Sequence, residues 1–191
     1  MAATDLLTLS EARDALNLSA TATDDDAEIW SIYIPAITPV VEDIVGPVVQ
    51  RSVTYTTDGG KTSILLPHSG LVSLDSITID GVAQVASKDY TANLSVGVIR
   101  PVWSWFGGGN GSVTVTYTAG IAASTETVPA AIKLAARLIL ANLWQGDQQG
   151  YRPEFGTPGD DASMQTPSGF AVPRQAYALL EPFAVSSVGI G

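Results

Sequence analysis

One stretch in the second half of the chain constrains the fold most: an alternating segment followed by an apolar helix. Residues 112–118 alternate Val and Tyr with Ser and Thr, the period-two pattern of a half-buried strand. Gly120 ends the segment. Pro129 opens the helix, because the N–H that it lacks would be unpaired in a first helical turn. The spacing predicts a strand that ends at 118 and a helix over 129–145, elements that pack and carry no nucleophile, metal ligand or phosphate loop.

The N-terminal part predicts helices within residues 8–45. Thr8 and Glu11 fit a capping box, in which each side chain accepts a hydrogen bond from the backbone N–H of the other residue. A second helix begins near residues 24–26, where three aspartates place negative charge at the positive end of the helix dipole. These aspartates lack the alternating ligand spacing of a calcium loop, so helix capping is the favoured interpretation.

The second helix is amphipathic but carries two prolines. Its apolar residues recur at gaps of three and four and form one stripe: Ile29, Ile32, Tyr33, Ala36, Ile37, Val40, Val41 and Ile44. Pro35 and Pro39 each remove a backbone donor and crowd the preceding turn. We therefore expect a kinked or broken helix that stops at Gly46.

Residues 48–118 predict a small antiparallel β region. Val49–Thr57 and Lys61–Leu66 flank an Asp-Gly-Gly turn, which predicts a hairpin. A strand that ends near Ile79 is followed by Asp80-Gly81, and we expect residues 82–85 to pair back across that turn. Two shorter strands, 90–94 and 96–102, surround Gly97.

Residues 146–191 predict a flexible linker and a C-terminal docking arm. Gly, Pro, Gln, Asp, Ser and Thr dominate residues 146–169. Apolar character then returns, and the residues predicted to dock on a partner are Phe170, Val172, Pro173, Tyr177, Leu180 and Phe183. The alternative is that this segment folds back on its own domain. The predicted organisation is an α+β core over 1–145, followed by the arm.

Charge restricts the partners of the chain. Its 191 residues carry a net charge of −10, which repels nucleic acid. Nine acidic residues and one basic residue precede Gly46, so the first helices form an acidic module. Solvated helix faces and caps explain such a module. The alternatives are an acidic surface that meets a basic partner and one that lines a passage for DNA. No apolar run approaches the about 20 residues of a membrane span, and the absence of cysteine excludes thiolate metal sites.

No group of residues predicts catalysis, a metal site or a cofactor site, so we expect a non-enzyme. His68 is interpreted as a solvent-facing turn residue. Residues 107–111 lack the Gly-Lys-Ser/Thr ending of a phosphate loop and predict a hairpin tip. Trp103, Trp105 and Phe106 could stack on bases or sugars, but packing against another protein chain is favoured.

The helix over 129–145 is apolar nearly all round, and so small a domain cannot cover every side of it. We therefore predict a closed cyclic oligomer with Lys133, Arg137 and Trp144 at the subunit interface. Lys133 and Arg137 share one helix face. They could pair with the acidic second helix of a neighbouring subunit.

Several parts of the chain occur together in a familiar order: residues 7–16, 25–29, 113–120 and 128–132, with 170–174 near the C-terminus. Their order and spacing resemble the head–tail connector (adaptor) proteins of long-tailed bacteriophages. The resemblance covers most of the chain as an arrangement, although each motif is generic. Pro35 and Pro39 depart from the usual regular helix, and the β region is larger than in compact members.

The resemblance implies a structural virion protein that forms a ring beneath the portal, a dodecamer in the virion, and continues the DNA channel. Its partners would be copies of itself, the portal protein and the next neck or tail protein, with DNA only passing through and no membrane. It implies no cofactor, and assembly in the bacterial host cytoplasm. Two alternatives stay open: another tail or baseplate adaptor, and a carbohydrate-binding β module that uses Trp103 and Trp105.

Overall fold

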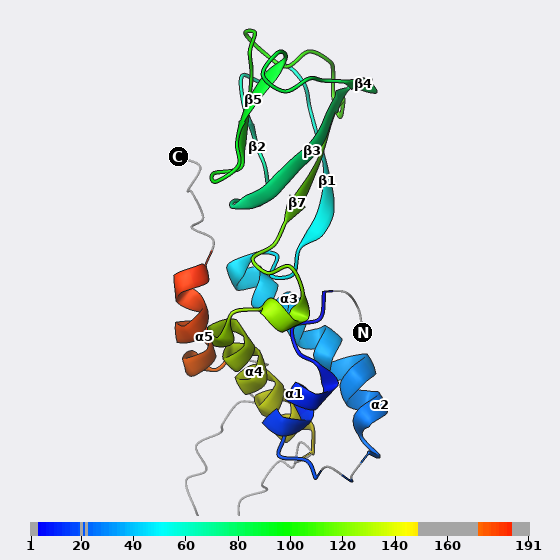
Figure 1. Cartoon of the computed structure of the whole chain (residues 1–191), viewed down its shortest axis with the longest axis vertical. Helices are drawn as coiled ribbons and strands as arrows, with labels where there is room; N and C mark the ends of the chain where they lie inside the picture. Colours follow the sequence, from blue (N-terminus) through cyan, green and yellow to red (C-terminus); the bar gives the residue numbers. More distant parts are fainter. Residues whose placement is uncertain (1–3, 20, 22, 149–171, 185–191) are drawn as a thin grey trace, which may run out of the picture.

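The computed structural model describes residues 4–19, 21, 23–148 and 172–184. Figure 1 shows an elongated molecule with its helices at one end and its strands at the other. We call these two ends the helical body and the β body. The predicted α+β class is confirmed.

The helical body contains elements from both ends of the chain. In chain order they are α1 (Leu9–Ala15), α2 (Asp26–Glu28), η1 (Ile29–Tyr33), α3 (Ile34–Val45), α4 (Ala130–Gln148), α5 (Arg174–Leu180) and η3 (Glu181–Phe183). The helix predicted over 129–145 is α4, and the carbonyl of Pro129 accepts the N–H of Lys133 in its first turn.

The predicted capping box holds the start of α1. The Thr8 N–H donates to Glu11 Oε2 over 2.9 Å, and the Glu11 N–H donates to Thr8 Oγ1 over 3.2 Å. Each bond satisfies a backbone donor that the first turn would otherwise leave unpaired. The local sequence signal therefore gave the correct helix start.

The two prolines of the second helix change its winding without ending it. Residues Asp26–Val45 stay helical, but η1 is a π-helix, in which the Ile34 N–H donates to the Ile29 carbonyl. This wider turn lies directly before Pro35, which cannot donate, and it relieves the crowding of the proline ring. Pro39 lies inside α3. The predicted interruption is thus a π-turn, and the helix does not break.

The β body contains two antiparallel sheets. One has the order β1-β7-β3-β4 and the other β2-β6-β5. The strands are β1 (Arg51–Thr57), β2 (Ile64–Leu65), β3 (Leu71–Ile79), β4 (Val82–Ala83), β5 (Tyr90–Asn93), β6 (Val98–Pro101) and β7 (Val113–Ala119). The predicted hairpins at Asp80-Gly81 and around Gly97 are confirmed, with Ile79 opposite Val82 and Asn93 opposite Val98.

The hairpin predicted across residues 58–60 is wrong. β1 pairs with β7, and β2 pairs with β6 in the other sheet. The Asp-Gly-Gly turn instead binds the glycine-rich tip: the Gly59 N–H donates to the Gly109 carbonyl over 2.9 Å, and the Gly111 N–H donates to Asp58 Oδ1 over 2.7 Å. β7 buries every second side chain and is the central strand, so it offers β1 more cross-strand contact than a short local partner does.

Each body has its own hydrophobic core. The core of the helical body includes Ile29, Ile34, Ile37, Val41, Ile132, Ile139, Leu140 and Leu180. The core of the β body includes Ile64, Ile77, Ile99, Phe106, Val113, Val115 and Tyr117. The two clusters share no residue among those that the structure describes. The region 1–145, predicted as one core, therefore contributes to two separately packed bodies, and the helical one also includes Leu180 from the predicted arm.

Two chain segments cross side by side from one body to the other. The Gln50 N–H donates to the Ala122 carbonyl and the Ala122 N–H donates to the Val48 carbonyl, each over 2.8 Å. Glu42, in the last turn of α3, stabilises this crossing. Its two carboxylate oxygens accept hydrogen bonds from the Arg51 guanidinium at 2.7 and 2.9 Å. The Val48 N–H donates to the same carboxylate. The crossing fixes how the two bodies sit on each other.

We predict that Gly120→Ala destabilises the protein through this crossing. Gly120 has a φ of 143°, and an added Cβ would lie 2.5 Å from the Gln50 backbone. Backbone atoms cannot move aside cheaply, so we expect the free energy of unfolding to fall by about 2 kcal/mol or more. Chemical denaturation measures this loss. The control is Gly109→Ala, where nothing lies within 4 Å. Equal losses in both variants would contradict the prediction.

Candidate assembly surfaces

The described residues hold no metal cluster. Nowhere in that part of the chain do three or more His, Asp or Glu side chains lie close enough together to bind a metal ion. Among the same residues, no helix combines the length and the apolar character that crossing a membrane requires.

His68 is a structural residue between the two sheets. Its Nδ1 lies 2.7 Å from the Tyr117 hydroxyl, a hydrogen bond that links the loop after β2 to β7. Burial and the nearby Arg51 lower the pKa of His68, against the opposing effect of Glu42. Burial and the neighbouring Tyr55 raise the pKa of Tyr117 to about 12. His68 is half-buried and hydrogen-bonded, so its interpretation as a solvent-facing turn residue is wrong; its partner lies 49 residues away, where no local pattern indicates it.

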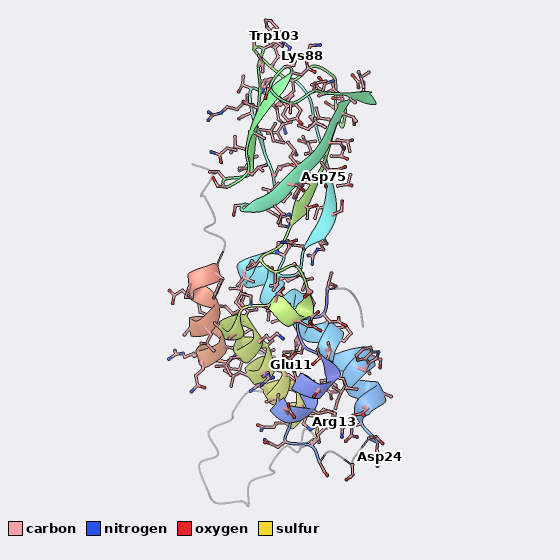
Figure 2. All side chains as sticks on the ribbon, in the orientation of Figure 1. Glu11, Arg13, Asp24, Asp75, Lys88 and Trp103 are labelled. Atoms are coloured by element: carbon pink, nitrogen blue, oxygen red, sulfur yellow. The ribbon has the colours of Figure 1, made fainter. Side chains whose placement is uncertain are left out.

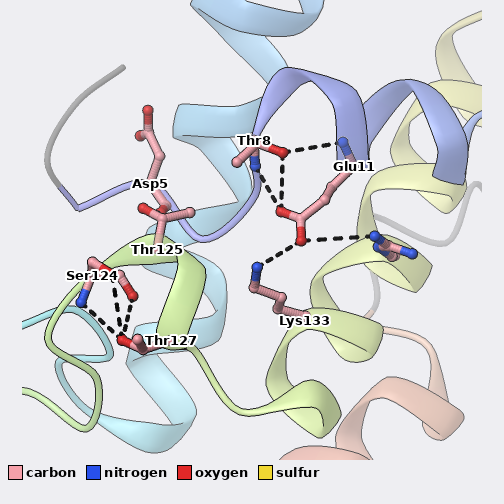
Figure 3. Close-up of polar contacts among 8 residues, drawn as sticks. Asp5, Thr8, Glu11, Ser124, Thr125, Thr127 and Lys133 are labelled. Atoms are coloured by element: carbon pink, nitrogen blue, oxygen red, sulfur yellow. Dashed lines mark hydrogen bonds and ion pairs between the residues drawn. The ribbon is translucent and has the colours of Figure 1, made fainter.

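Glu11 joins α1 to α4 through the two cations that were predicted to face a neighbouring subunit (Figure 3). Lys133 Nζ donates to Glu11 Oε1 over 2.6 Å, and the Arg137 guanidinium lies 3.8 Å from the same oxygen. Burial of Glu11 disfavours its charge. The bonds from Lys133 and Thr8 outweigh that burial, and the pKa of Glu11 is lowered. Lys133 thus has a partner in its own chain.

Arg137 is paired less well than Lys133. Its ion pair with Glu11 is long, and its buried Nε lacks a hydrogen-bond partner among the described residues. Leu134, one turn earlier on α4, is 49% exposed. Trp144 is half-buried and packs edge-on against Tyr33, with ring centroids 5.1 Å apart. Of the three predicted interface residues, Arg137 therefore keeps the most capacity for a further contact.

The described part of the C-terminal segment packs on the helical body of the same chain. Ala176 and Leu180 of α5 are fully buried, and Val172 and Phe183 lie against the same core. Tyr177 is about half exposed. Phe170 lies outside the described residues. Leu180 therefore packs within its own chain, as in the alternative that the segment folds back on its own domain. Tyr177 stays accessible to a partner.

The fold occurs in solved structures of gene transfer agent (GTA) particles. In the neck of an empty particle computed with C6 symmetry, the matching chain is 20% identical with a TM-score of 0.66, over 97% of this chain and 93% of that one. In the virion of the native particle, the matching chain is 18% identical with a TM-score of 0.68, over 97% of this chain and 93% of that one. In the neck of the native particle computed with C12 symmetry, the matching chain is 18% identical with a TM-score of 0.66, over 97% of this chain and 92% of that one. No curated protein matches the chain.

The family model described as "Head completion protein" matches residues 5–184. The chain belongs to this family. Membership confirms the resemblance to head–tail connectors, and it gives the chain a structural role in the virion, where it joins head to tail.

The helical body of this head completion family member carries several exposed acids, and the β body exposes Asp58, Asp75 and Asp80. Asp14, Asp24, Glu28 and Asp43 are all exposed on the helical body. Arg13, in contrast, donates to Asp26 over 2.9 Å and to the Ser19 carbonyl over 2.7 Å. The predicted acidic module therefore presents free carboxylates to any neighbour of the helical body.

We predict that Glu11→Gln destabilises the protein in a pH-dependent way. Gln keeps the capping box but loses the charge that Lys133 binds, so we expect a loss of about 1–2 kcal/mol at neutral pH. The folded-state pKa of Glu11 is lowered. The stability that ionised Glu11 contributes is therefore present above the unfolded-state pKa, and it is lost as the pH falls through the folded-state pKa. Thermal melts of both proteins from neutral to acidic pH should converge at low pH. The exposed Glu126→Gln is the control, and a constant difference at every pH would contradict the prediction.

We also predict that Leu180→Ala lowers stability and that Tyr177→Ser has little effect. Leu180 is fully buried in the helical core, and truncation of such a side chain costs about 2–5 kcal/mol. Tyr177 is exposed on the same helix. Denaturation at several protein concentrations tests whether α5 packs within its own chain, because contacts within one chain give a midpoint that does not change with concentration. A midpoint that rises with concentration would indicate that α5 docks on another copy.

Proposed function

We propose that the chain forms a closed ring beneath the portal and that this ring continues the channel through which DNA leaves the head. The observation that carries the proposal is the match of the head completion family to residues 5–184. Proteins of similar fold lie in necks computed with C6 and C12 symmetry. Sixfold or twelvefold assembly of this chain is consistent with those symmetries, and we propose the dodecamer.

The outer face of α4 is the proposed ring interface in the helical body. Leu134 exposes apolar surface there, and the Arg137 side chain is 36% exposed and lies 3.8 Å from Glu11, its ion-pair partner in the same chain. The exposed acids near α2, Asp24 and Glu28, supply the complementary charge on a neighbouring copy. Two different patches that bind head to tail close into a ring when the rotation between copies permits it.

The net charge of −10 supports the role as a conduit. An acidic wall repels the DNA phosphates, so DNA passes without binding. Tyr177, with the partly exposed Val172, Pro173 and Phe183 of the same segment, is the proposed contact to the portal, and the next neck or tail protein binds the opposite side of the ring. No catalytic activity or cofactor is part of this role. Assembly takes place in the host cytoplasm before the neck of the virion is complete.

We predict that Leu134→Glu and Arg137→Ala each weaken ring assembly without unfolding the chain. The first change places a charge in an apolar contact, and the second removes a cation that pairs with a neighbour, so we expect the assembly midpoint to rise at least about tenfold in concentration. Mass photometry over a concentration series measures this, and circular dichroism checks the fold.

Val72→Glu is the matched control, because Val72 is similarly exposed but lies on β3 of the β body. Rings that persist in both α4 variants would place the helical interface elsewhere. A wild-type chain that stays monomeric, both alone and with purified portal, would contradict the ring itself. Binding to oligosaccharides by such a monomer would instead favour the carbohydrate-binding alternative.

A further inference from the structure

The outer face of the β2-β6-β5 sheet carries apolar residues beside the polar Thr91, Asn93 and Arg100. Leu65 of β2 is 52% exposed, and its register partner Val98 lies on the same face of the sheet. Val96 in the turn before β6 and Val102 just after it are also about half exposed. The opposite face holds the buried Ile64 and Ile99. A sheet that has one face on the core normally carries polar residues on the other, so the exposed apolar residues on this face indicate a contact surface.

A rigid aromatic tip adjoins this face. Trp103 and Trp105 are 76% and 64% exposed, whereas Phe106 between them and β7 is only 2% exposed. Backbone bonds hold both ends of the tip: the Val102 N–H donates to the Asp89 carbonyl, and the Phe106 N–H donates to the Lys61 carbonyl, each over 2.9 Å. Figure 2 places Trp103 at the end of the β body farthest from the helices. Large aromatic side chains are typical energetic centres of protein interfaces.

The same sheet also carries a groove. It has a volume of about 230 Å³ and is lined by Thr91, Ala92, Asn93, Val96, Val98 and Arg100. This volume is below the about 300–1,000 Å³ of small-molecule pockets, so a protein side chain is a better match in size than a cofactor. Arg100 is exposed at the groove, and a guanidinium of this kind stacks on the face of a Trp ring.

We propose that the tryptophan tip of one copy inserts into the β5–β6 groove of the next copy. The inference rests on the proposed ring, and it adds a second contact, between β bodies, to the one between helical bodies. Trp103 and Trp105 form the protruding half of the contact, and Val96, Val98 and Arg100 form the receiving half. In the proposed ring each copy gives its tip to one neighbour and its groove to the other, so the contact is head to tail and continues from copy to copy, whereas a reciprocal exchange between two copies would stop at a dimer.

A second copy explains the patch better than other occupants. The chain supplies the aromatic ring, the apolar groove and the cation that stacks on the ring, so no outside component is needed. Of the nine Lys and Arg residues in the chain, four lie in the β body, where they are matched by four Asp residues. This charge balance does not attract phosphate backbones.

Single-cysteine cross-linking tests the proposal directly, because the natural chain contains no cysteine. Ser104→Cys lies between the two tryptophans, and Thr91→Cys lies in the groove, so neither change removes Trp103, Trp105 or Arg100. The two variants are purified, mixed and treated with a short bis-maleimide. We expect a cross-linked dimer in the mixture and much less in either variant alone. The variant that carries both cysteines should give a ladder beyond the dimer.

Trp103→Ala combined with Trp105→Ala, in the mixed cysteine variants, should reduce the cross-link at least about tenfold. Arg100→Ala should reduce it by less. Val82→Ser is the control, since Val82 is 65% exposed but lies on β4 of the other sheet. A blue shift of tryptophan fluorescence as wild-type chains assemble, absent from the double Trp variant, would support the same contact.

Several results would overturn the inference. One is the absence of the mixed cross-link at every soluble concentration. Another is an equally strong cross-link between two Ser104→Cys chains, and the third is a double-cysteine variant whose cross-linking stops at the dimer. Rings that form without the mixed cross-link would leave the proposed function intact and remove only this contact. Failure of the wild-type chain to form rings with the portal would contradict the proposed function itself. A blue shift on addition of N-acetylglucosamine oligomers to monomeric protein would assign the tip to carbohydrate.

Discussion

The bidentate pair between Glu42 and Arg51 lies where the two bodies of the molecule meet, and their relative placement depends on it. The hydrophobic clusters on either side share no described residue, so apolar packing alone does not hold one body against the other. The carboxylate ties the end of α3 to the first residue of β1, and it also accepts the Val48 N–H. Charge-assisted bonds of this geometry are directional. They therefore fix an orientation as well as a distance.

Fixed orientation matters for a protein that joins two larger structures. An assembly in which each copy contacts its neighbours at both ends of an elongated chain requires every copy to hold the same angle between its ends. The parallel bridge between Val49 and Ala122 and the brace at Glu42 limit hinge motion at the only described crossing between the bodies. The helical body and the β body then lie at opposite ends of the molecule in a fixed orientation (Figure 1).

Sequence reasoning predicted those features that depend on neighbouring residues. The Thr8–Glu11 capping box, the Asp80-Gly81 hairpin and the alternating strand that became β7 each follow from spacings of a few positions. It failed where the partner is far away in the chain. The Asp-Gly-Gly turn at 58–60 looked like a hairpin because nothing local indicates that β7 competes for β1. The partners of His68 and Lys133, Tyr117 and Glu11, lie 49 and 122 residues away. Of the three aromatic residues that were predicted from the sequence to contact another chain, Trp103 and Trp105 are exposed, whereas Phe106 is buried in the core of the β body.

The side-by-side crossing at Val48–Gln50 and Ala122 has a topological consequence. The chain leaves the helical body after α3 and returns to it before α4. The outgoing and returning segments lie side by side and are hydrogen-bonded to each other. The whole β body is thus an insertion into a helical protein, and its length does not affect the register of the helices that flank it. Evolution can enlarge, exchange or shorten such an insertion while the helical body stays unchanged. One helical scaffold can therefore serve particles whose necks differ in width and in what they must contact.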